Sequence, residues 1–159
     1  MKRRKVLFVC TGNTCRSPMA EFLFRREIKR RRIKFVDSAS AGIFAKNSVA
    51  INEKSAACLA SRGIDFSKFV PRQLRHKMLE NSFLVVCMTR EQKELLGGTG
   101  NICCVHDLTG FEVPDPYGGS AEEYEQTAKL LEATAEAIIR KYFSDEIPAA
   151  IKKTGREKR

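Results

Sequence analysis

The chain has 159 residues, of which 43% are hydrophobic and 30% are charged, and its formal net charge is +10. This composition is typical of one folded domain and excludes an intrinsically disordered chain. No apolar run approaches the roughly 20 residues that cross a bilayer, which excludes a membrane-spanning helix. The apolar run of residues 6–9 is also too short for an export signal, so the sequence predicts a cytoplasmic protein.

The positive charge is concentrated near the N-terminus. Residues 1–34 contain 12 lysines or arginines against 2 acids, whereas residues 35–159 contain 17 of each. Such a region can attract nucleic acid, acidic membranes or phosphorylated partners. Base stacking requires aromatic side chains, and the basic run of residues 25–32 contains none. The composition of this run therefore disfavours nucleic acid as a partner. The simpler interpretation is a solvated helix end whose cations favour the negative pole of the helix dipole.

Strands and helices are predicted to alternate along the chain. Apolar runs predict strands at residues 6–9, from residue 33, at 83–88 and at 102–105. Helices are predicted at residues 18–32, 50–62, 89–96 and from 121 onward. Ser17 is the expected cap of the first helix, with Pro18 in its first turn, and Ser120 with Glu123 forms a capping box before the last.

The alternation predicts an α/β fold in a single domain, a parallel sheet with helices on both faces. The domain is expected to span residues 1–145, followed by a basic C-terminal tail of residues 146–159. Six cysteines in a cytoplasmic chain are expected to stay reduced. The adjacent pair at residues 103–104 and the absence of a C-x-x-C pair argue against a metal site. Cys58, Cys87 and Cys103 lie in apolar patterns and are predicted to be buried.

The loop between the first strand and the first helix carries the strongest chemical signal. Residues 10–17 read Cys-Thr-Gly-Asn-Thr-Cys-Arg-Ser. A loop that wraps into a helix N-terminus turns its N–H groups toward an anion, and such a site stabilises a cysteine thiolate. Cys10 is therefore the candidate nucleophile, and Arg16 can hold two phosphoryl oxygens through its planar guanidinium. Gly12 allows the backbone to approach the anion closely. The Asn13 amide is expected to brace the loop, and the Ser17 hydroxyl to donate to the thiolate. The other predicted phosphate-binding positions are Thr11, Thr14 and Cys15.

A second loop supplies a candidate proton donor. Asp115 lies between two prolines in the run Val-Pro-Asp-Pro-Tyr of residues 113–117, and the prolines stiffen the backbone on both sides of it. A carboxyl held over an anion-binding loop can act as general acid and then as general base. Taken alone, this run would be interpreted as a turn; paired with the Cys10 loop, it predicts a third catalytic residue.

At these residues the chain resembles the low-molecular-weight protein tyrosine phosphatase family. The resemblance rests on residues 9–21, 40–42, 62–65 and 115–118, and it implies a four-stranded parallel sheet with no metal or cofactor. It also implies that Cys10 is the nucleophile, Arg16 the phosphate clamp and Asp115 the general acid, and that Cys15 can form a protective disulfide with Cys10. Family members often carry a histidine of a polar network near the position of Phe69, so the resemblance does not establish that network here. Tyr117 is followed by Gly118, so regulation through two adjacent tyrosines is not supported.

Thr14 bears on the substrate. Phosphotyrosine-selective relatives usually carry a bulky aliphatic residue at this position, whereas the loop here resembles that of bacterial protein arginine phosphatases. A small hydroxyl can hydrogen-bond to the edge of a guanidinium, where an aliphatic group only packs. Phe44 and Tyr117 resemble the two pocket walls of that branch. The sequence therefore favours phosphoarginine in a protein substrate, with phosphotyrosine as the alternative.

Two other functions remain open at this point. Arsenate reduction uses a related loop and fold together with further cysteines, and Cys87, Cys103 and Cys104 are present. A phosphate-binding module without catalysis would also explain an oxyanion site in the loop. The histidines, His76 and His106, are interpreted as surface or structural residues.

Overall fold

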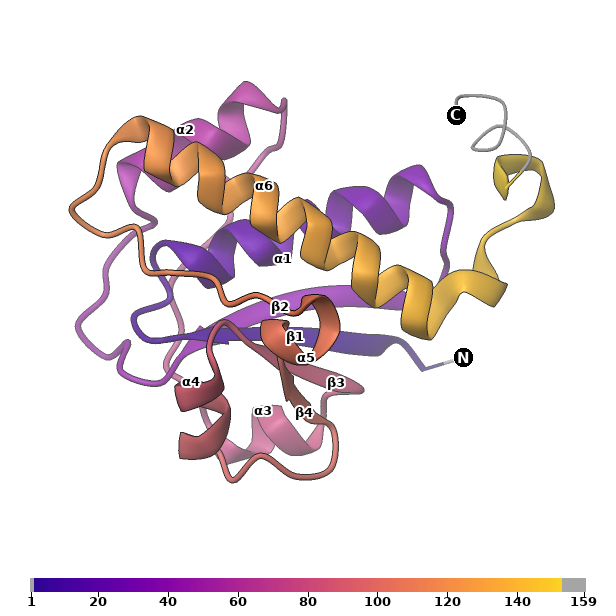
Figure 1. The fold of residues 1–159 in the computed structure, drawn as a ribbon, viewed down its shortest axis with the longest axis horizontal. Coiled ribbons are helices and arrows are strands. Elements are labelled where there is room, and N and C mark those ends of the chain that lie inside the picture. Colours follow the sequence, from indigo (N-terminus) through magenta and orange to yellow (C-terminus); the bar gives the residue numbers. More distant parts are fainter. Residues whose placement is uncertain (1, 153–159) are drawn as a thin grey trace.

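The computed structural model describes residues 2–152, which form one four-stranded parallel sheet with the strand order β2-β1-β3-β4 (Figure 1). The strands are β1 (Arg4–Cys10), β2 (Val36–Gly42), β3 (Leu84–Cys87) and β4 (Ile102–Cys104). Every neighbouring pair of strands is parallel, so each connection has to cross over the sheet. The predicted α/β fold with a parallel sheet is confirmed.

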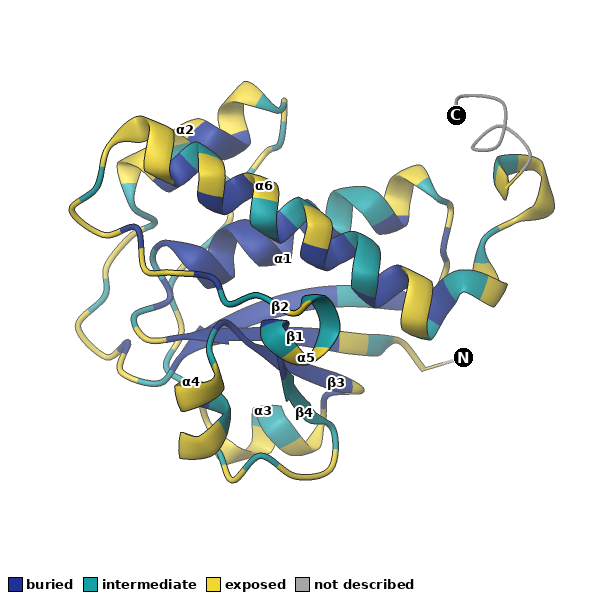
Figure 2. Cartoon of the chain, viewed as in Figure 1, coloured by how far each residue is buried: buried dark blue, intermediate teal, exposed yellow. Residues whose placement is uncertain are grey.

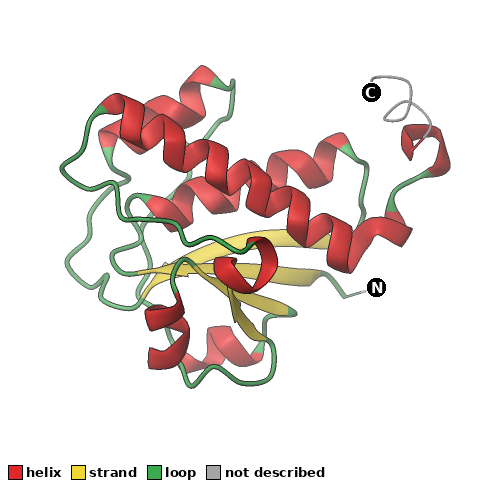
Figure 3. Ribbon diagram, in the orientation of Figure 1, coloured by secondary structure: helices red, strands yellow, loops and turns green. Residues whose placement is uncertain are grey.

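Helices cover both faces of this sheet (Figure 3). One face packs against α1 (Arg16–Arg30), α2 (Glu53–Ser61), α5 (Val105–Thr109) and α6 (Ala121–Ile138), and the other against α3 (His76–Glu80) and α4 (Arg90–Leu95). Side chains of β1 alternate between the two cores: Val6 and Phe8 lie in the first, Leu7 and Val9 in the second. Strands β2 and β3 and most of β1 are buried, the edge strand β4 is half-buried, and α6 exposes only its outer side (Figure 2).

The first helix begins earlier than predicted. Helix α1 starts at Arg16 and Cys15 occupies its N-cap position, so the prediction that Ser17 caps the helix is wrong. Ser17 lies inside the first turn with no exposed surface, and its hydroxyl contacts Cys10 Sγ. At the other end Arg32 and Phe35 have φ angles of 53° and 61°. These left-handed residues turn the chain, so β2 begins at Val36 instead of Ile33.

Other element ends differ by a few residues. Helix α2 starts at Glu53 because the Asn52 side chain accepts from the next backbone N–H groups, that of Lys54 at 2.9 Å. Strands β3 and β4 are shorter than predicted, and α3 and α5 were not predicted at all. Each of these two helices has 5 residues, too few for a helical period to be recognised. Before α6, Ser120 Oγ accepts from Glu123 N at 3.2 Å, which is one half of the predicted capping box. Within residues 2–152 no return bond runs from the Glu123 side chain to Ser120 N.

The basic run of residues 25–32 is the predicted solvated helix end only in part. Lys29, Arg30 and Arg32 are exposed, and the first two lie in the last turn of α1. The other cations make ion pairs within the fold. Arg26 lies 3.1 Å from Glu132 and Arg31 lies 3.0 Å from Glu136, two carboxylates of α6. Arg62, at the end of α2, reaches Glu132 at 2.7 Å. Much of the local positive charge is therefore neutralised within the fold, where it joins α1 and α2 to α6.

The C-terminal region continues past the predicted domain end. A π-helical turn (Ile139–Phe143) and a 3₁₀ turn (Ser144–Glu146) follow α6, Glu146 pairs with Arg4, and Ile147 packs against the core. Residues 153–159 of the predicted tail lie outside the described residues. Within residues 2–152, no helix combines the length and the hydropathy that crossing a membrane requires.

Candidate active site

The loop of residues 11–15 leaves the carboxyl end of β1 at a topological switch point. The chain runs from β1 to β2 on one side and later returns to β3 on the other side of β1. Connections that leave in opposite directions open a crevice beyond the strand ends, where α/β folds bind their ligands. The predicted anion loop lies at this crevice.

Donors from the segment that follows β2 hold the backbone of the loop. Ile43 N donates to Cys10 O at 3.0 Å, Phe44 N to Thr11 O at 2.8 Å, Ser48 Oγ to Gly12 O at 2.7 Å, and Asn52 N to Thr14 O at 2.9 Å. Because these carbonyl groups face outward, the N–H groups of the loop and of the first helical turn can face an anion.

A cavity of about 260 Å³ opens over the loop. It is lined by Cys10, Thr11, Gly12, Thr14, Cys15, Arg16, Asp115 and Tyr117. The structure therefore brings the three predicted catalytic residues and Tyr117 to one cavity. Phe44, predicted as a pocket wall, is not part of the lining and is 73% exposed. Asn13 and Ser17 have no exposed surface and lie beneath the loop.

Cys10 lies at the floor of the cavity, with Sγ 2.8 Å from Ser17 Oγ. Asn13 Nδ2 donates to this same Oγ at 2.8 Å. Since the Ser17 oxygen accepts from Asn13, its own hydrogen can point to the sulfur. The Ser17 hydroxyl is thus placed to donate a hydrogen bond to the Cys10 sulfur.

Asn13 is braced from both sides of its amide. Its Nδ2 also donates to Ser40 Oγ at 2.9 Å, and its Oδ1 accepts the backbone N–H of Arg72 at 2.8 Å. Ser40 Oγ in turn donates to Glu21 Oε1 at 2.7 Å. Glu21 is only 4% exposed, and burial raises its pKa above the usual value. An ion pair with Arg25 at 2.9 Å opposes that shift.

Arg16 and Asp115 meet at the rim of the cavity. Arg16 is 5% exposed, and its Nη1 donates to Val113 O at 3.1 Å. Its Nη2 lies 3.8 Å from Asp115 Oδ2. The second carboxylate oxygen of Asp115 accepts from Tyr117 N at 3.1 Å. The guanidinium is thus aimed over the loop, with a carboxyl group beside it.

Most of the chain matches one known family. The family model described as low molecular weight phosphotyrosine protein phosphatase matches residues 5–154. The chain belongs to this family. It is therefore an enzyme of the protein phosphatase class.

Individual relatives cover nearly the full length. A protein-arginine-phosphatase of Bacillus subtilis is 32% identical over 88% of this chain and 97% of its own length. A low-molecular-weight protein-tyrosine-phosphatase of Acinetobacter johnsonii is 29% identical over 83% of this chain and 93% of its own. Among solved structures, a low-molecular-weight protein tyrosine phosphatase from T. tengcongensis has a TM-score of 0.80 and 35% identity, covering 87% of this chain and 99% of that one.

A polar network supports the loop from behind, and it contains no histidine among the described residues. Phe69 contacts Phe22 edge-to-face at 6.0 Å between ring centroids. The carboxylate of Glu21 instead reaches Ser40 directly. The chain therefore supports Asn13 through a serine and a glutamate, and the apolar side chain of Phe69 takes no part in this network.

All six cysteines are free thiols in the described structure. Cys15 Sγ lies 3.4 Å from the hydroxyl of Tyr124, and burial raises the pKa of this tyrosine. Cys58 and Cys87 are buried as predicted, whereas Cys103 is half-buried. His76 is exposed and pairs with Glu80 at 3.0 Å, in keeping with a surface position.

Sequence reasoning missed three residues that position the loop: Ser40, Glu21 and Gly42. A Cβ on Gly42 would lie 2.7 Å from Thr11 O and 2.9 Å from Asn13 N, so only glycine lets the end of β2 lie this close to the loop. The available signal was the run of small residues at 38–42. Nothing local in the sequence connects it to Glu21.

Replacing Asn13 by alanine is expected to destabilise the protein by about 2–4 kcal/mol. The change removes the bonds of the fully buried Asn13 amide, including the acceptor of the Arg72 N–H, and it forces alanine to adopt the φ of 56° that asparagine tolerates better. Urea unfolding followed by circular dichroism measures the loss. The exposed Asn47→Ala variant is the control, and an equal effect of the two changes would contradict the bracing role.

Proposed function

We propose that this enzyme removes phosphoryl groups from protein side chains through a thiophosphate intermediate on Cys10. In the first step the Cys10 thiolate attacks phosphorus and an S–P bond forms. The bond from phosphorus to the side-chain nitrogen or oxygen breaks, and Asp115 gives its proton to the leaving group. Arg16 and the loop N–H groups hold the phosphoryl oxygens as their charge develops.

In the second step water hydrolyses the intermediate. Asp115, now a carboxylate, takes a proton from water as the oxygen attacks phosphorus. The S–P bond breaks, phosphate leaves and the thiolate is restored, with the Ser17 hydroxyl to stabilise it. The observation that carries this proposal is the 2.8 Å contact between Cys10 Sγ and Ser17 Oγ beneath the Arg16 guanidinium. A solved mutant of the YwlE arginine phosphatase with a phosphorylated active-site serine, 31% identical to this chain, supports a covalent intermediate at this position.

For the substrate we propose phosphoarginine ahead of phosphotyrosine. Thr14 lines the cavity, and within the described residues its hydroxyl has only a 3.8 Å contact with Cys15 Sγ. That hydroxyl is therefore available to the polar edge of a guanidinium. Tyr117, 76% exposed at the same cavity, offers a ring that either substrate can stack on. Relatives named for each activity are similar to this chain, so the distinction rests on Thr14.

The Thr14→Ile variant tests this preference. We expect the wild type to hydrolyse phosphoarginine peptides with the higher kcat/KM, and the variant to lose about tenfold or more of that advantage over phosphotyrosine peptides. A lost polar contact and an added apolar surface each contribute roughly 1 kcal/mol to such a change. A wild-type preference for phosphotyrosine that the substitution leaves unmoved would refute the assignment.

The buried cysteines bear on the reductase alternative. Cys87 has no exposed surface, and burial raises its pKa to about 12. At pH 8 roughly one molecule in ten thousand would then carry the thiolate that reacts. We expect native Cys87 to resist iodoacetamide and to react only after unfolding, as peptide mapping by mass spectrometry would show. Ready labelling of the native protein would favour electron relay over phosphatase chemistry.

The reduced state that Cys10 needs is related to the cellular compartment of the enzyme. Hydrolysis by Cys10 requires the reduced form, which the cytosol maintains. The six free cysteines of the structure are consistent with this requirement, and we place the enzyme in the cytosol.

A further inference from the structure

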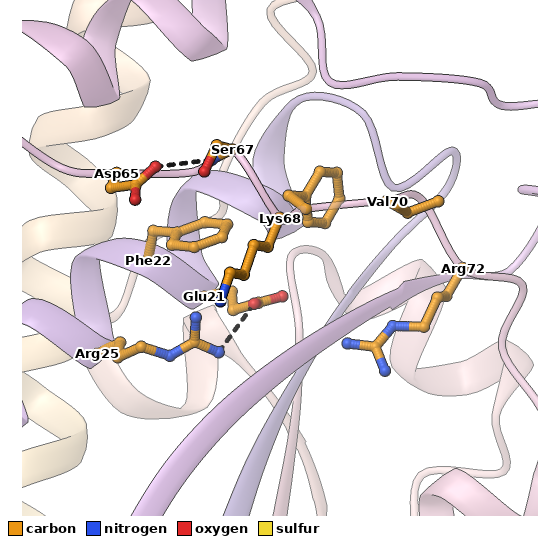
Figure 4. A pocket seen from close by; sticks show the side chains of 9 residues that line it. Glu21, Phe22, Arg25, Asp65, Ser67, Lys68, Val70 and Arg72 are labelled. Atoms are coloured by element: carbon orange, nitrogen blue, oxygen red, sulfur yellow. Dashed lines mark hydrogen bonds and ion pairs between the residues drawn. The ribbon is translucent and has the colours of Figure 1, made fainter.

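A second cavity, of about 500 Å³, lies between α1 and the segment of residues 65–72 (Figure 4). Glu21, Phe22 and Arg25 line it from α1, and the segment adds residues of both charges and apolar side chains. Its volume is within the usual range of small-molecule sites. It shares no lining residue with the cavity over Cys10.

The cavity presents cations that the fold does not neutralise by contact. Within residues 2–152, neither Lys68 nor Arg72 makes a side-chain hydrogen bond or ion pair; the acids Asp65 and Glu21 influence them only through space. The third cation, Arg25, already pairs with Glu21 at 2.9 Å and with Asp37 at 3.2 Å. The lining therefore carries three cations against the two carboxylates Glu21 and Asp65, and Lys68 and Arg72 are the two of these cations without a contact partner in residues 2–152.

Aromatic and apolar side chains stand beside these cations. Phe22 and Phe69 contact each other edge-to-face at 6.0 Å, and the Arg25 guanidinium lies 5.0 Å from the Phe22 ring centroid. Val70 in the same wall is 65% exposed. A site with this lining suits a ligand that has an anionic group at one end and an apolar ring at the other.

Two contacts join this cavity to the catalytic loop at one residue. The backbone N–H of Arg72 donates to Asn13 Oδ1 at 2.8 Å. Glu21 reaches the other end of the same amide through the Ser40 hydroxyl. A ligand that moves either side of the cavity therefore acts on the residue that orients Ser17 and, through it, Cys10.

We propose that this cavity binds a small organic anion, a carboxylate or phosphate group joined to an apolar ring, and that its occupancy is transmitted to Asn13. The binding is inferred from the cavity alone, whereas an effect of the ligand on activity also depends on the proposed phosphatase function. The anionic group would lie between Lys68 and Arg72, and the ring would lie on Phe22, Phe69 and Val70.

Nuclear magnetic resonance on the full chain tests the site, with orthovanadate added to fill the catalytic loop. Benzoate and phenylphosphonate are the carboxylate and phosphate probes. We expect at least one of them to cause saturable shifts in the amides of Phe69 and Arg72 and in the side-chain amide of Asn13. Failure of orthovanadate to bind would count against the proposed function, which separates that failure from a failure of the second site.

Variants at the two cations decide the assignment. The Lys68→Gln, Arg72→Gln double variant keeps the backbone N–H that holds Asn13, and it should bind the probe at least about tenfold more weakly. Lys129→Gln, an exposed change on α6, is the matched control and should bind normally. Equal binding by the double variant, or shifts that never saturate, would overturn the site. Saturable binding that leaves Asn13 unmoved would overturn the coupling.

Discussion

A Cys10→Ser variant is expected to lose turnover of phosphopeptides by roughly a thousandfold or more while it still binds phosphate. Serine has nearly the same shape as cysteine, but its hydroxyl does not ionise near neutral pH. The loop N–H groups and Arg16 remain in place to hold the anion, since Cys10 is 3% exposed and the change leaves the floor of the cavity filled. Steady-state kinetics and calorimetric titration with inorganic phosphate measure the two effects separately.

Cys58→Ser provides the matched control. Cys58 is also buried, at 7% exposure, but it belongs to α2 and lies outside the cavity. We expect this variant to keep its activity within a few-fold. Full activity in Cys10→Ser would refute the mechanism. A wild type that binds phosphate and turns over no phosphopeptide would instead indicate a binding module.

The Asp115→Asn variant should lower kcat on phosphopeptides by roughly 10²- to 10⁴-fold. Asparagine can still accept the N–H of Tyr117, which Asp115 now accepts at 3.1 Å, but it has no proton to give to the departing guanidine of phosphoarginine or phenolate of phosphotyrosine. An aryl phosphate with an acidic phenol as leaving group needs little protonation. The same variant should therefore lose much less activity on p-nitrophenyl phosphate.

Glu112→Gln is the control for this second prediction. Glu112 lies on the same loop and pairs with Arg90 at 3.2 Å, an interaction that holds its pKa below the usual value, and it does not line the cavity. Removal of the Glu112 charge should leave kcat unchanged on both phosphopeptides and p-nitrophenyl phosphate. An equal loss on good and poor leaving groups in Asp115→Asn would show that Asp115 positions Arg16 and does not donate the proton.

The parts of the site that are contiguous in the chain could be predicted from sequence. Cys10 and Arg16 are six positions apart at a strand–helix junction, so the local backbone alone brings the thiol and the guanidinium to one cavity. The strands were recognised for the same reason, since their apolar runs are short-range patterns. Ser17 shows the limit of such reasoning: its role at the sulfur was expected, but its place inside the helix was not.

Contacts between distant parts of the chain required the tertiary structure. Asp115 was predicted as the acid, but its 3.8 Å approach to Arg16 depends on packing between segments 99 positions apart. Phe44 was expected in the pocket and lies outside it. Its backbone N–H donates to Thr11 O, and its ring faces solvent.

The loop of residues 11–15 also has parts that the sequence determines and parts that depend on tertiary contacts. By itself the sequence determined the α/β fold and the place of Cys10 and Arg16 on one strand–helix loop, because each depends on neighbours within a few residues. Only the tertiary structure decided what braces Asn13, namely Ser40, Glu21 and the backbone of Arg72. These groups come from three separate segments, and hydrogen bonds between them form only once the sheet and α1 have packed together.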